Sequence, residues 1–500
     1  MSHSFLSNKT SLALLTDFYQ LTMSYGYWKA GFDRKEAVFH LFFRTLPFDG
    51  GYAIAAGLQS VIEYLENFRF DESDLAYLAS LKSYSGKQLF SDEFFDYLAK
   101  MKFSCTVDAV LEGTPVFPYE PLLRIRGPLI QCQILESPLL NLINFPSLIA
   151  TKASRICLAA KGDPVLEFGL RRAQGIDGAL TASRASYIGG CDSTSNILAG
   201  KLYGIPVKGT HSHSWVMVFD DELEAFKTFG KYLPENTVFL VDTYNTLNGV
   251  EKAIEAAKEL RKQGYRFLGI RLDSGDLAEL SIKSRALMDE AGFQDAAIVA
   301  SNELDETIIS ELKRQGAKIA VWGVGTNLVT AKDQPAFDGV YKISAVRDPK
   351  GPWKYKLKLS EQMKKVSNPG ILQVKRFSAN GIYVGDAIYD IQSKMDQDVS
   401  IVDPFDATLE HHFSKELESE DLLQPIFKKG QLVYQLPSLL EIKERTAFLL
   451  KKLPNGVKRF LNPHKYVVGL EKSLYNIKIK LIKDIRANMA QDYTVPENET

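Results

Sequence analysis

The chain has 500 residues, of which 45% are hydrophobic and 24% are charged, and its formal net charge is −1. This length exceeds one ordinary hydrophobic core, so we expect a globular protein of two or three domains. The near-neutral charge lacks the electrostatic signature of a protein that binds nucleic acid or a membrane surface.

Residues 1–150 mix strands and helices. The runs AVFHLFF and TVDAVLEG are rich in β-branched and aromatic residues and predict strands at 37–43 and 106–113. The segment SDEFFDYLAKM predicts a helix with Ser91 as its N-cap and Glu93 in its first turn. We therefore expect an N-terminal α/β domain over residues 1–150.

From about residue 160, short apolar runs recur, each followed by Gly, Asp, Ser or Thr. The runs are PVLEF, IPVKG, TVFLV, FLGIRL, AAIVA, KIAVW and GVYKISAV, and helical patterns such as GVEKAIEAAKELRKQG lie between them. Repeated strand–helix–strand units build a parallel sheet. Roughly seven such strands within residues 151–349 favour an irregular β/α barrel, with a doubly wound sheet as the alternative.

The repeating pattern stops after Ala345. The stretch RDPKGPWKYKLKLSEQMKKVSNPG is basic and contains turn residues, and the remainder alternates short strands with a final helix, EKSLYNIKIKLIKDIR. We expect residues 350–500 to return to the N-terminal segment and to complete its α/β domain.

The expected compartment is the cytoplasm. Four scattered cysteines without a C-x-x-C pair argue against a zinc knuckle or a disulfide framework. The N-terminus does not resemble a signal peptide, and the longest uncharged stretch has 15 residues, which is too short to span a bilayer.

Polar residues follow the apolar runs, and in a β/α barrel the chemistry lies at these carboxyl ends of the strands. The residues expected to converge there are Arg171, Arg172, Thr210, His211, His213, Asp242, Thr243, Arg271, Asp273, Ser274, Asp276, Ser301–Glu303 and Gly323–Asn327. A pocket of arginines, carboxylates and a glycine-rich turn suits a phosphorylated sugar.

The histidines and the aspartates each allow more than one interpretation. His211 and His213 could be a metal pair, ordinary buried polar residues, or a proton shuttle or nucleophile. Asp242 and Asp273 could bind ribose hydroxyls, hold a hydrated Mg²⁺ ion, or simply cap helices.

The glycine-rich turn and the arginines point to anionic ligands. The GVGTN turn could offer its backbone N–H groups and the Thr326 hydroxyl to a phosphate, or it could simply end a strand. Arg171 and Arg271 could pair with a carboxylate or a phosphate, and a strand-end arginine such as Arg271 is costly to bury unless it is paired.

Seven segments are distinctive as an ordered set: LLTDFYQLTMSYGYW, EFGLRRAQGIDGALTASRASYIGGCDSTSNILAG, VKGTHSHSWVM, LVDTYNT, GIRLDSGDL, WGVGTNLVT and NPHKYVVGL. Together they resemble the nicotinate phosphoribosyltransferase family over nearly the whole chain. The resemblance implies a type II phosphoribosyltransferase fold, an irregular β/α barrel with an α/β domain, assembled as a homodimer with shared active sites. It also implies that nicotinate, phosphoribosyl pyrophosphate and ATP react to give nicotinate mononucleotide, pyrophosphate, ADP and phosphate.

The resemblance further implies roles for individual residues. The nicotinate contacts would be Phe168, Arg171, Thr210, Arg271 and, from the partner subunit, Tyr19. The phosphoribosyl pyrophosphate contacts would be Asp242, Asp273, Gly323, Gly325 and Thr326. His213 would be the phosphorylated histidine and would act in catalysis with Asp273 and Arg271, whereas His211 stands at a variable position. Mg²⁺ would be the cofactor and ATP the co-substrate.

The expected chemistry agrees with these residue types. The pyridine nitrogen is already a nucleophile, cleavage of the anomeric bond builds positive charge on the sugar, and the departing pyrophosphate needs cations. A sugar-phosphate aldolase or isomerase would need a Schiff-base lysine or an acid–base pair, and Lys208 has no such partner in the sequence. A nicotinamide-specific enzyme and a nucleotide-sensing scaffold without turnover remain alternatives.

Overall fold

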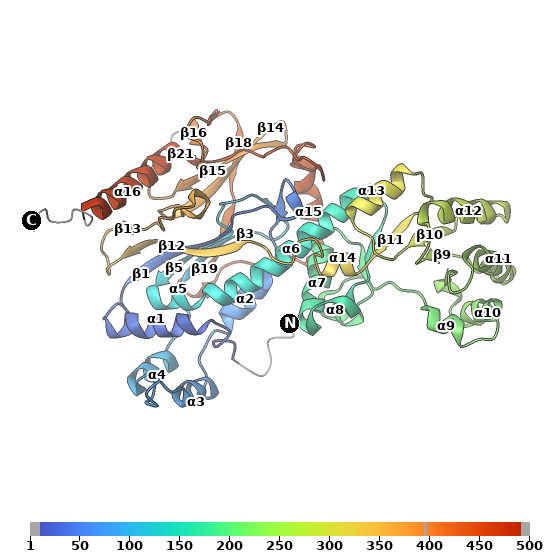
Figure 1. The fold of residues 1–500 in the computed structure, drawn as a ribbon, viewed down its shortest axis with the longest axis horizontal. Coiled ribbons are helices and arrows are strands. Elements are labelled where there is room, and N and C mark those ends of the chain that lie inside the picture. The colour runs from blue at the N-terminus through green and yellow to red at the C-terminus, as the bar shows by residue number, and fades with distance from the viewer. Residues whose placement is uncertain (1–10, 395–397, 492–500) are drawn as a thin grey trace, which may run out of the picture. The chain divides into compact units, whose positions relative to one another are not determined.

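The structure is a computed structural model that describes residues 11–394 and 398–491 (Figure 1). The chain divides into two compact units. The first consists of the described residues of Met1–Ser147, Ala336–Ser438 and Ala447–Thr500, and the second of Leu148–Pro335 and Leu439–Thr446. No helix in these described ranges is long and apolar enough to cross a membrane.

Two large β-sheets form the framework of the first unit. One has the order β13 (Lys354–Tyr355), β12 (Gly339–Arg347), β1 (Glu36–Phe43), β5 (Leu123–Pro128), β3 (Thr106–Val110), β19 (Leu423–Lys428), β20 (Gln431–Leu432). The other has the order β17 (Glu410–Phe413), β16 (Val399–Val402), β21 (Val468–Glu471), β15 (Ile382–Asp390), β14 (Leu372–Ala379), β18 (Glu418–Asp421). A two-stranded sheet pairs β2 (Ala53–Ile54) with β4 (Pro115–Val116). β1 and β3 confirm the two strands predicted near the N-terminus.

The helices that lie wholly in the first unit are α1 (Phe18–Lys29), α2 (Leu58–Glu66), α3 (Glu72–Ser80), α4 (Asp92–Ala99), α5 (Leu129–Ile134) and α16 (Lys472–Gln491). Two more, α6 (Glu136–Ala160) and α15 (Leu439–Lys452), contribute residues to both units. α4 confirms the helix predicted over 91–101, with Ser91 at the N-cap position and Glu93 in the first turn.

Six parallel strands form the sheet of the second unit. Their order is β7 (Ser193–Thr194), β6 (Val165–Glu167), β11 (Val321–Val324), β10 (Ala297–Ala300), β9 (Gly269–Leu272), β8 (Val238–Leu240). The connecting helices are α7 (Gly175–Gly189), α8 (Ile197–Tyr203), α9 (His213–Met217), α10 (Glu222–Tyr232), α11 (Thr246–Lys262), α12 (Leu277–Glu290), α13 (Glu306–Arg314) and α14 (Thr326–Val329). This arrangement confirms the predicted irregular β/α barrel.

The barrel is irregular at residues 205–211, a segment that contacts both edge strands, β7 and β8. This segment contains the predicted strand IPVKG. Val207 forms only an isolated parallel bridge with Thr194 of β7. Toward β8 the Thr210 hydroxyl donates to the Val238 carbonyl, and the Leu240 N–H donates to His211 Nε2 at 3.2 Å. Side chains therefore make the contacts to β8 that we expected from a strand.

The last predicted barrel strand, GVYKISAV, belongs to a different sheet. β12 pairs antiparallel with β1, in a register that runs from Glu36↔Arg347 to Phe43↔Gly339. The long segment of the second unit ends at Pro335, whereas the predicted barrel segment 151–349 includes this strand. An apolar run predicts that a strand is buried, but it does not specify which sheet buries it.

Gly269 allows β9 and β10 to approach closely at the start of β9. Its φ is +149°, and a Cβ at this position would lie 2.0 Å from the Ala297 carbonyl oxygen. A larger residue would push the strands apart. This contact begins the register Ala297↔Gly269 and Val299↔Arg271, which places the arginine near the carboxyl end of the barrel.

Candidate active site

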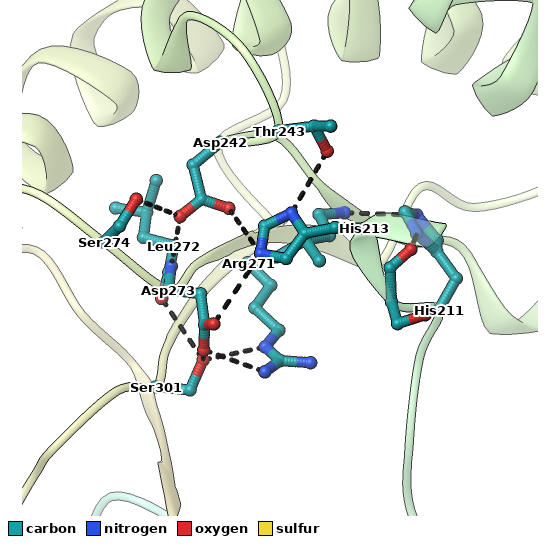
Figure 2. A network of polar contacts seen from close by, with 11 residues as sticks. His211, His213, Asp242, Thr243, Arg271, Leu272, Asp273, Ser274 and Ser301 are labelled. Atoms are coloured by element: carbon teal, nitrogen blue, oxygen red, sulfur yellow. Dashed lines mark hydrogen bonds and ion pairs between the residues drawn. The ribbon is translucent and has the colours of Figure 1, made fainter. Parts of the chain in front are cut away.

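The carboxyl ends of three neighbouring strands bring a polar cluster together (Figure 2). Its members, from β8, β9, β10 and the start of α9, are Asp242, Thr243, Arg271, Asp273, Ser274, Ser301 and His213. The sequence predicts this convergence because the parallel strands of a β/α barrel end on the same face.

The Arg271 guanidinium is held by two neighbours. Nε donates to Ser301 Oγ at 2.8 Å, and Nη2 donates to Asp273 Oδ1 at 2.9 Å. Its Cζ lies 5.5 Å from the centroid of the Phe168 ring, within the range of a cation–π contact. Nη1 makes no hydrogen bond to any of the described residues, so one side of the guanidinium remains available to a ligand.

The Asp273 carboxylate is held in its charged form. Burial raises its pKa, but hydrogen bonds from Ser301 and Arg271, together with the positive charge of Arg271, outweigh burial and hold the pKa below its usual value. Oδ1 accepts from both of these side chains, and Oδ2 lies 3.7 Å from His213 Nε2.

Asp242 is buried and organises the loop after β9. Its Oδ2 accepts from the Asp273 N–H at 3.0 Å and from the Ser274 hydroxyl at 2.6 Å. Its Oδ1 is buried without a hydrogen-bond partner among the described residues and lies 4.0 Å from His213 Nε2. A buried carboxylate oxygen in this state calls for a donor or a cation.

The His213 imidazole lies between a hydroxyl and two carboxylates. Nδ1 is 3.2 Å from Thr243 Oγ1, and Nε2 faces Asp242 and Asp273 (Figure 2). When Nδ1 carries the proton and donates it to Thr243, the lone pair on Nε2 is free to act as a nucleophile.

A cavity of about 310 Å³ opens beside this cluster. Of the residues predicted for the site, it is lined by Phe168, Arg171, Thr210, His213, Arg271 and Asp273. His211 also lines the cavity, as do five residues that the sequence did not single out: Leu170, Ser195, Gly209, Ser212 and Leu240. Asp242 is absent from this lining but supports it through its contact with Asp273.

Ser195 shows why some lining residues were missed. It follows β7, which consists only of Ser193 and Thr194, and both are buried. The Thr194 hydroxyl is satisfied within the barrel, where it donates to buried Glu167 at 2.6 Å. A strand of two polar residues produces no apolar run, so no sequence signal marks its end.

The glycine-rich turn lies at the end of β11. A Cβ on Gly323 would come within 2.8 Å of Phe168 ring atoms, so packing against this ring requires a glycine. Gly325 is the N-cap residue of α14 and Thr326 is its first residue. None of the three lines the described cavity.

Tyr19 belongs to α1 of the first unit and is 49% exposed. It lines a different cavity, of about 500 Å³, whose lining includes Asp17, Glu136 and Asn144, all in the first unit. The structure therefore places Tyr19 on an accessible helix of the first unit, and its contact with nicotinate stays a prediction.

The donor set around His213 bears on metal binding. Among residues 11–394 and 398–491, no group of three or more His, Cys, Asp or Glu side chains is arranged to hold a metal ion. Asp242 and Asp273 nevertheless offer two carboxylates on the same side of the imidazole, and Asp242 Oδ1 lacks a hydrogen bond. These residues fit a Mg²⁺ ion that is held jointly with phosphate oxygens.

Three family models cover most of the chain. The N-terminal domain of nicotinate phosphoribosyltransferase matches residues 14–144, the family's own model matches 165–347, and its C-terminal domain matches 371–478. The nicotinate phosphoribosyltransferase of Bacillus subtilis is 42% identical, with 96% of this chain and 97% of the relative covered. The human protein of the same name is 35% identical, with 92% and 95% covered.

Solved structures agree with the sequence relatives. The crystal structure of human nicotinic acid phosphoribosyltransferase superposes with a TM-score of 0.80 at 32% identity, covering 93% of this chain and 99% of that one. The nicotinate-nucleotide pyrophosphorylase of Pyrococcus furiosus gives a TM-score of 0.67 at 25% identity, with 90% and 99% covered. By identity, coverage and fold, the chain belongs to the nicotinate phosphoribosyltransferase family.

Proposed function

We propose that this chain transfers the phosphoribosyl group of phosphoribosyl pyrophosphate to nicotinate and couples the transfer to ATP hydrolysis. The products are nicotinate mononucleotide, pyrophosphate, ADP and phosphate, and the reaction begins NAD synthesis from nicotinate. The observation that carries the proposal is the grouping of Arg271, Phe168, Asp273 and His213 around one cavity. The activity named for the relatives supports it.

Phe168 and Arg271 supply the nicotinate end of the cavity. A planar pyridine ring can stack on the Phe168 ring while its carboxylate pairs with the free side of the guanidinium. Arg171 lines the same cavity and adds a second positive charge, which favours a carboxylate over a neutral carboxamide. Thr210 lines it too, and Tyr19 of the partner subunit is proposed to stack on the opposite face of the ring.

Asp242 and Asp273 supply the sugar-phosphate end. Their carboxylates can stabilise the positive charge that develops on the ribose as its anomeric bond breaks. They are also the residues that would hold Mg²⁺, which when bound offsets the negative charge of the pyrophosphate. Gly323, Gly325 and Thr326, at the end of β11, are proposed to bind the ribose phosphate.

His213 is proposed to accept the γ-phosphoryl group of ATP on Nε2. The bond between the γ-phosphorus and the bridging oxygen breaks, a phosphorus–nitrogen bond forms, and ADP leaves; water later hydrolyses the phosphoimidazole to phosphate. In the tautomer in which Nδ1 donates to the Thr243 hydroxyl, Nε2 carries the lone pair that attacks the phosphorus. Ribosyl transfer itself needs no covalent enzyme intermediate, so phosphorylation acts on substrate binding and site closure.

The test is an assay of nicotinate-dependent pyrophosphate release with and without ATP, run in parallel with nicotinamide. We expect turnover with nicotinate, stimulation by ATP, and acid-labile label from γ-phosphate-labelled ATP. His213→Asn should lose both the label and the stimulation, while it still forms product slowly at high substrate. Turnover with nicotinamide instead, or no turnover with either pyridine, would overturn the proposal.

A further inference from the structure

The outer edge of β8 is paired by side chains rather than by a strand. The Val238 carbonyl accepts from the Thr210 hydroxyl, and the Leu240 N–H donates to His211 Nε2 at 3.2 Å. In a parallel sheet, one residue of a neighbouring strand would donate its N–H to the first of these groups and accept from the second. Thr210 and His211 thus reproduce with two side chains the hydrogen bonds of one strand residue.

The same segment is held to β7 by its backbone. The Thr194 N–H donates to the Pro206 carbonyl at 3.0 Å, and the Lys208 N–H donates to the Thr194 carbonyl at 3.1 Å. Residues 206–211 therefore connect the two edge strands of the barrel, and His211 is the acceptor that completes the connection on the β8 side.

The His211 ring is built into its position. It is 7% exposed, and its centroid lies 5.0 Å from that of Phe229 and 6.1 Å from that of Phe226. Nε2 accepts the Leu240 N–H, so the proton belongs on Nδ1, which lies 3.3 Å from the Ser212 carbonyl oxygen. Burial lowers the pKa of His211 to about 4, which keeps the ring neutral and the acceptor intact near neutral pH.

Both residues of the His211–Leu240 contact lie close in sequence to a residue of the proposed phosphate-accepting site. His213 follows His211 by two residues, and Thr243, which contacts His213 Nδ1 at 3.2 Å, follows Leu240 by three. We infer that His211 is a positioning residue that fastens the 209–213 segment to β8 and thereby holds His213 against Thr243, Asp242 and Asp273. The inference rests on the proposed role of His213, and it gives a function to the histidine at the variable position.

The experiment compares His211→Phe, which keeps an aromatic ring but has no acceptor, with His211→Gln, whose amide oxygen can accept in place of Nε2. His412→Phe is the matched control, because His412 is an exposed histidine that contacts Ser400 at 2.8 Å in the first unit. Each protein is assayed for acid-labile label, for the ratio of rates with and without ATP, and for hydrogen exchange of the peptide that contains Leu240.

We expect His211→Phe to lower the rate of labelling at least about tenfold, because a small displacement of an attacking atom is costly. The amide of Leu240 should exchange faster in this variant, His211→Gln should recover most of both signals, and His412→Phe should match the wild type. A general loss of folded protein would lower the rate without ATP as well, so the ratio of rates with and without ATP distinguishes it from a local displacement of His213. Normal labelling in His211→Phe, or no recovery in His211→Gln, would overturn the inference.

Failure of the proposed function is distinguishable from failure of this inference. If the wild type itself takes no label, the coupling to ATP is wrong, and His211 is judged by the exchange of Leu240 and by the Michaelis constant for phosphoribosyl pyrophosphate. Unchanged values of both in His211→Phe would then overturn the positioning role. Faster exchange of the Leu240 amide in His211→Phe, together with a raised Michaelis constant that returns to the wild-type value in His211→Gln, would support it.

Discussion

Arg271 is oriented by contacts that only a guanidinium can make together. Nε and Nη2 bind Ser301 and Asp273, while the group lies over the Phe168 ring. Arg271→Lys keeps the charge but loses this geometry, so we expect the Michaelis constant for nicotinate to rise about tenfold or more. The constant for phosphoribosyl pyrophosphate should change much less. Steady-state kinetics with each substrate varied in turn provides the measurement.

Arg266 supplies the control for this substitution. It is an exposed arginine on the segment before β9, and its Nε lies 3.0 Å from Asp295 Oδ2. Arg266→Lys should leave both Michaelis constants at the wild-type values. An equal rise of both constants in Arg271→Lys would mean that this arginine orders the whole site rather than recognising nicotinate.

His40 makes the first unit sensitive to acid. Its Nε2 accepts the Leu372 N–H at 3.1 Å, and burial, with a smaller effect from Arg124, lowers its pKa well below 6.5. Below about pH 6.5 an unfolded chain binds a proton at His40 while the folded protein does not. The free energy of unfolding therefore decreases as the pH is lowered below this value. This group alone contributes a loss of roughly 1.4 kcal/mol per pH unit once the pH is well below 6.5.

His40→Gln retains an acceptor for Leu372 but does not titrate. We expect the melting temperature of this variant to decline less between pH 7 and pH 5 than that of the wild type, measured by scanning calorimetry at several pH values. His412→Gln, at an exposed histidine, should decline as steeply as the wild type. Parallel curves for His40→Gln and the wild type would rule out His40 as a source of acid lability.

The strands of the barrel were predictable to different degrees. β8, β9, β10 and β11 are apolar runs followed by polar residues, and the sequence placed Asp242, Arg271, Asp273 and Ser301 correctly at their ends. β7 was missed because its two residues are polar and buried. The run IPVKG was expected to be a strand. The contacts to β8 are made instead by the side chains of the next two residues, Thr210 and His211, and such side-chain hydrogen bonds leave no periodic pattern in the sequence.

Helices α6 and α13 are joined by a buried ion cluster. Glu306 at the start of α13 receives Lys152 Nζ at 2.8 Å and Arg155 Nε at 2.7 Å, both from α6. Burial raises the pKa of Glu306, but the two cations outweigh it and hold the pKa below its usual value. Glu306→Gln removes the buried anion that both cations share and leaves Lys152 with the exposed Asp333 carboxylate at 2.9 Å, so we expect a loss of roughly 3 kcal/mol in unfolding free energy.

Glu311 on the same helix provides the comparison. It forms an exposed ion pair with Arg314 at 2.6 Å, and such pairs contribute little because water and salt screen them. Denaturant titrations should show a large shift of midpoint for Glu306→Gln and little shift for Glu311→Gln. Similar small shifts in both variants would mean that the charges of the buried cluster contribute as little to the unfolding free energy as a surface pair does.

The two units differ in which parts of the sequence they contain and in which of the proposed site residues they carry. Strands from distant parts of the sequence pair within the first unit, as β1 does with β12 and β3 with β19. The residues that line the candidate cavity all belong to the second unit, whereas Tyr19 belongs to the first. The sequence resemblance assigned Tyr19 to nicotinate through the partner subunit, a role that only an assembled protein can test.

Subunit mixing tests this shared site. A dimer of one Tyr19→Ala chain and one Arg271→Ala chain contains one site with both defects and one site with neither, provided that Tyr19 acts across the subunit boundary. Random exchange of two inactive proteins should then restore about a quarter of wild-type activity, since half of the dimers are mixed and half of their sites are intact.

Mixing Arg271→Ala with Asp273→Ala should restore none, because both residues line the cavity of one chain. Native mass spectrometry of tagged chains measures the exchange. Full exchange without recovery in the first mixture would show that Tyr19 does not act across the boundary.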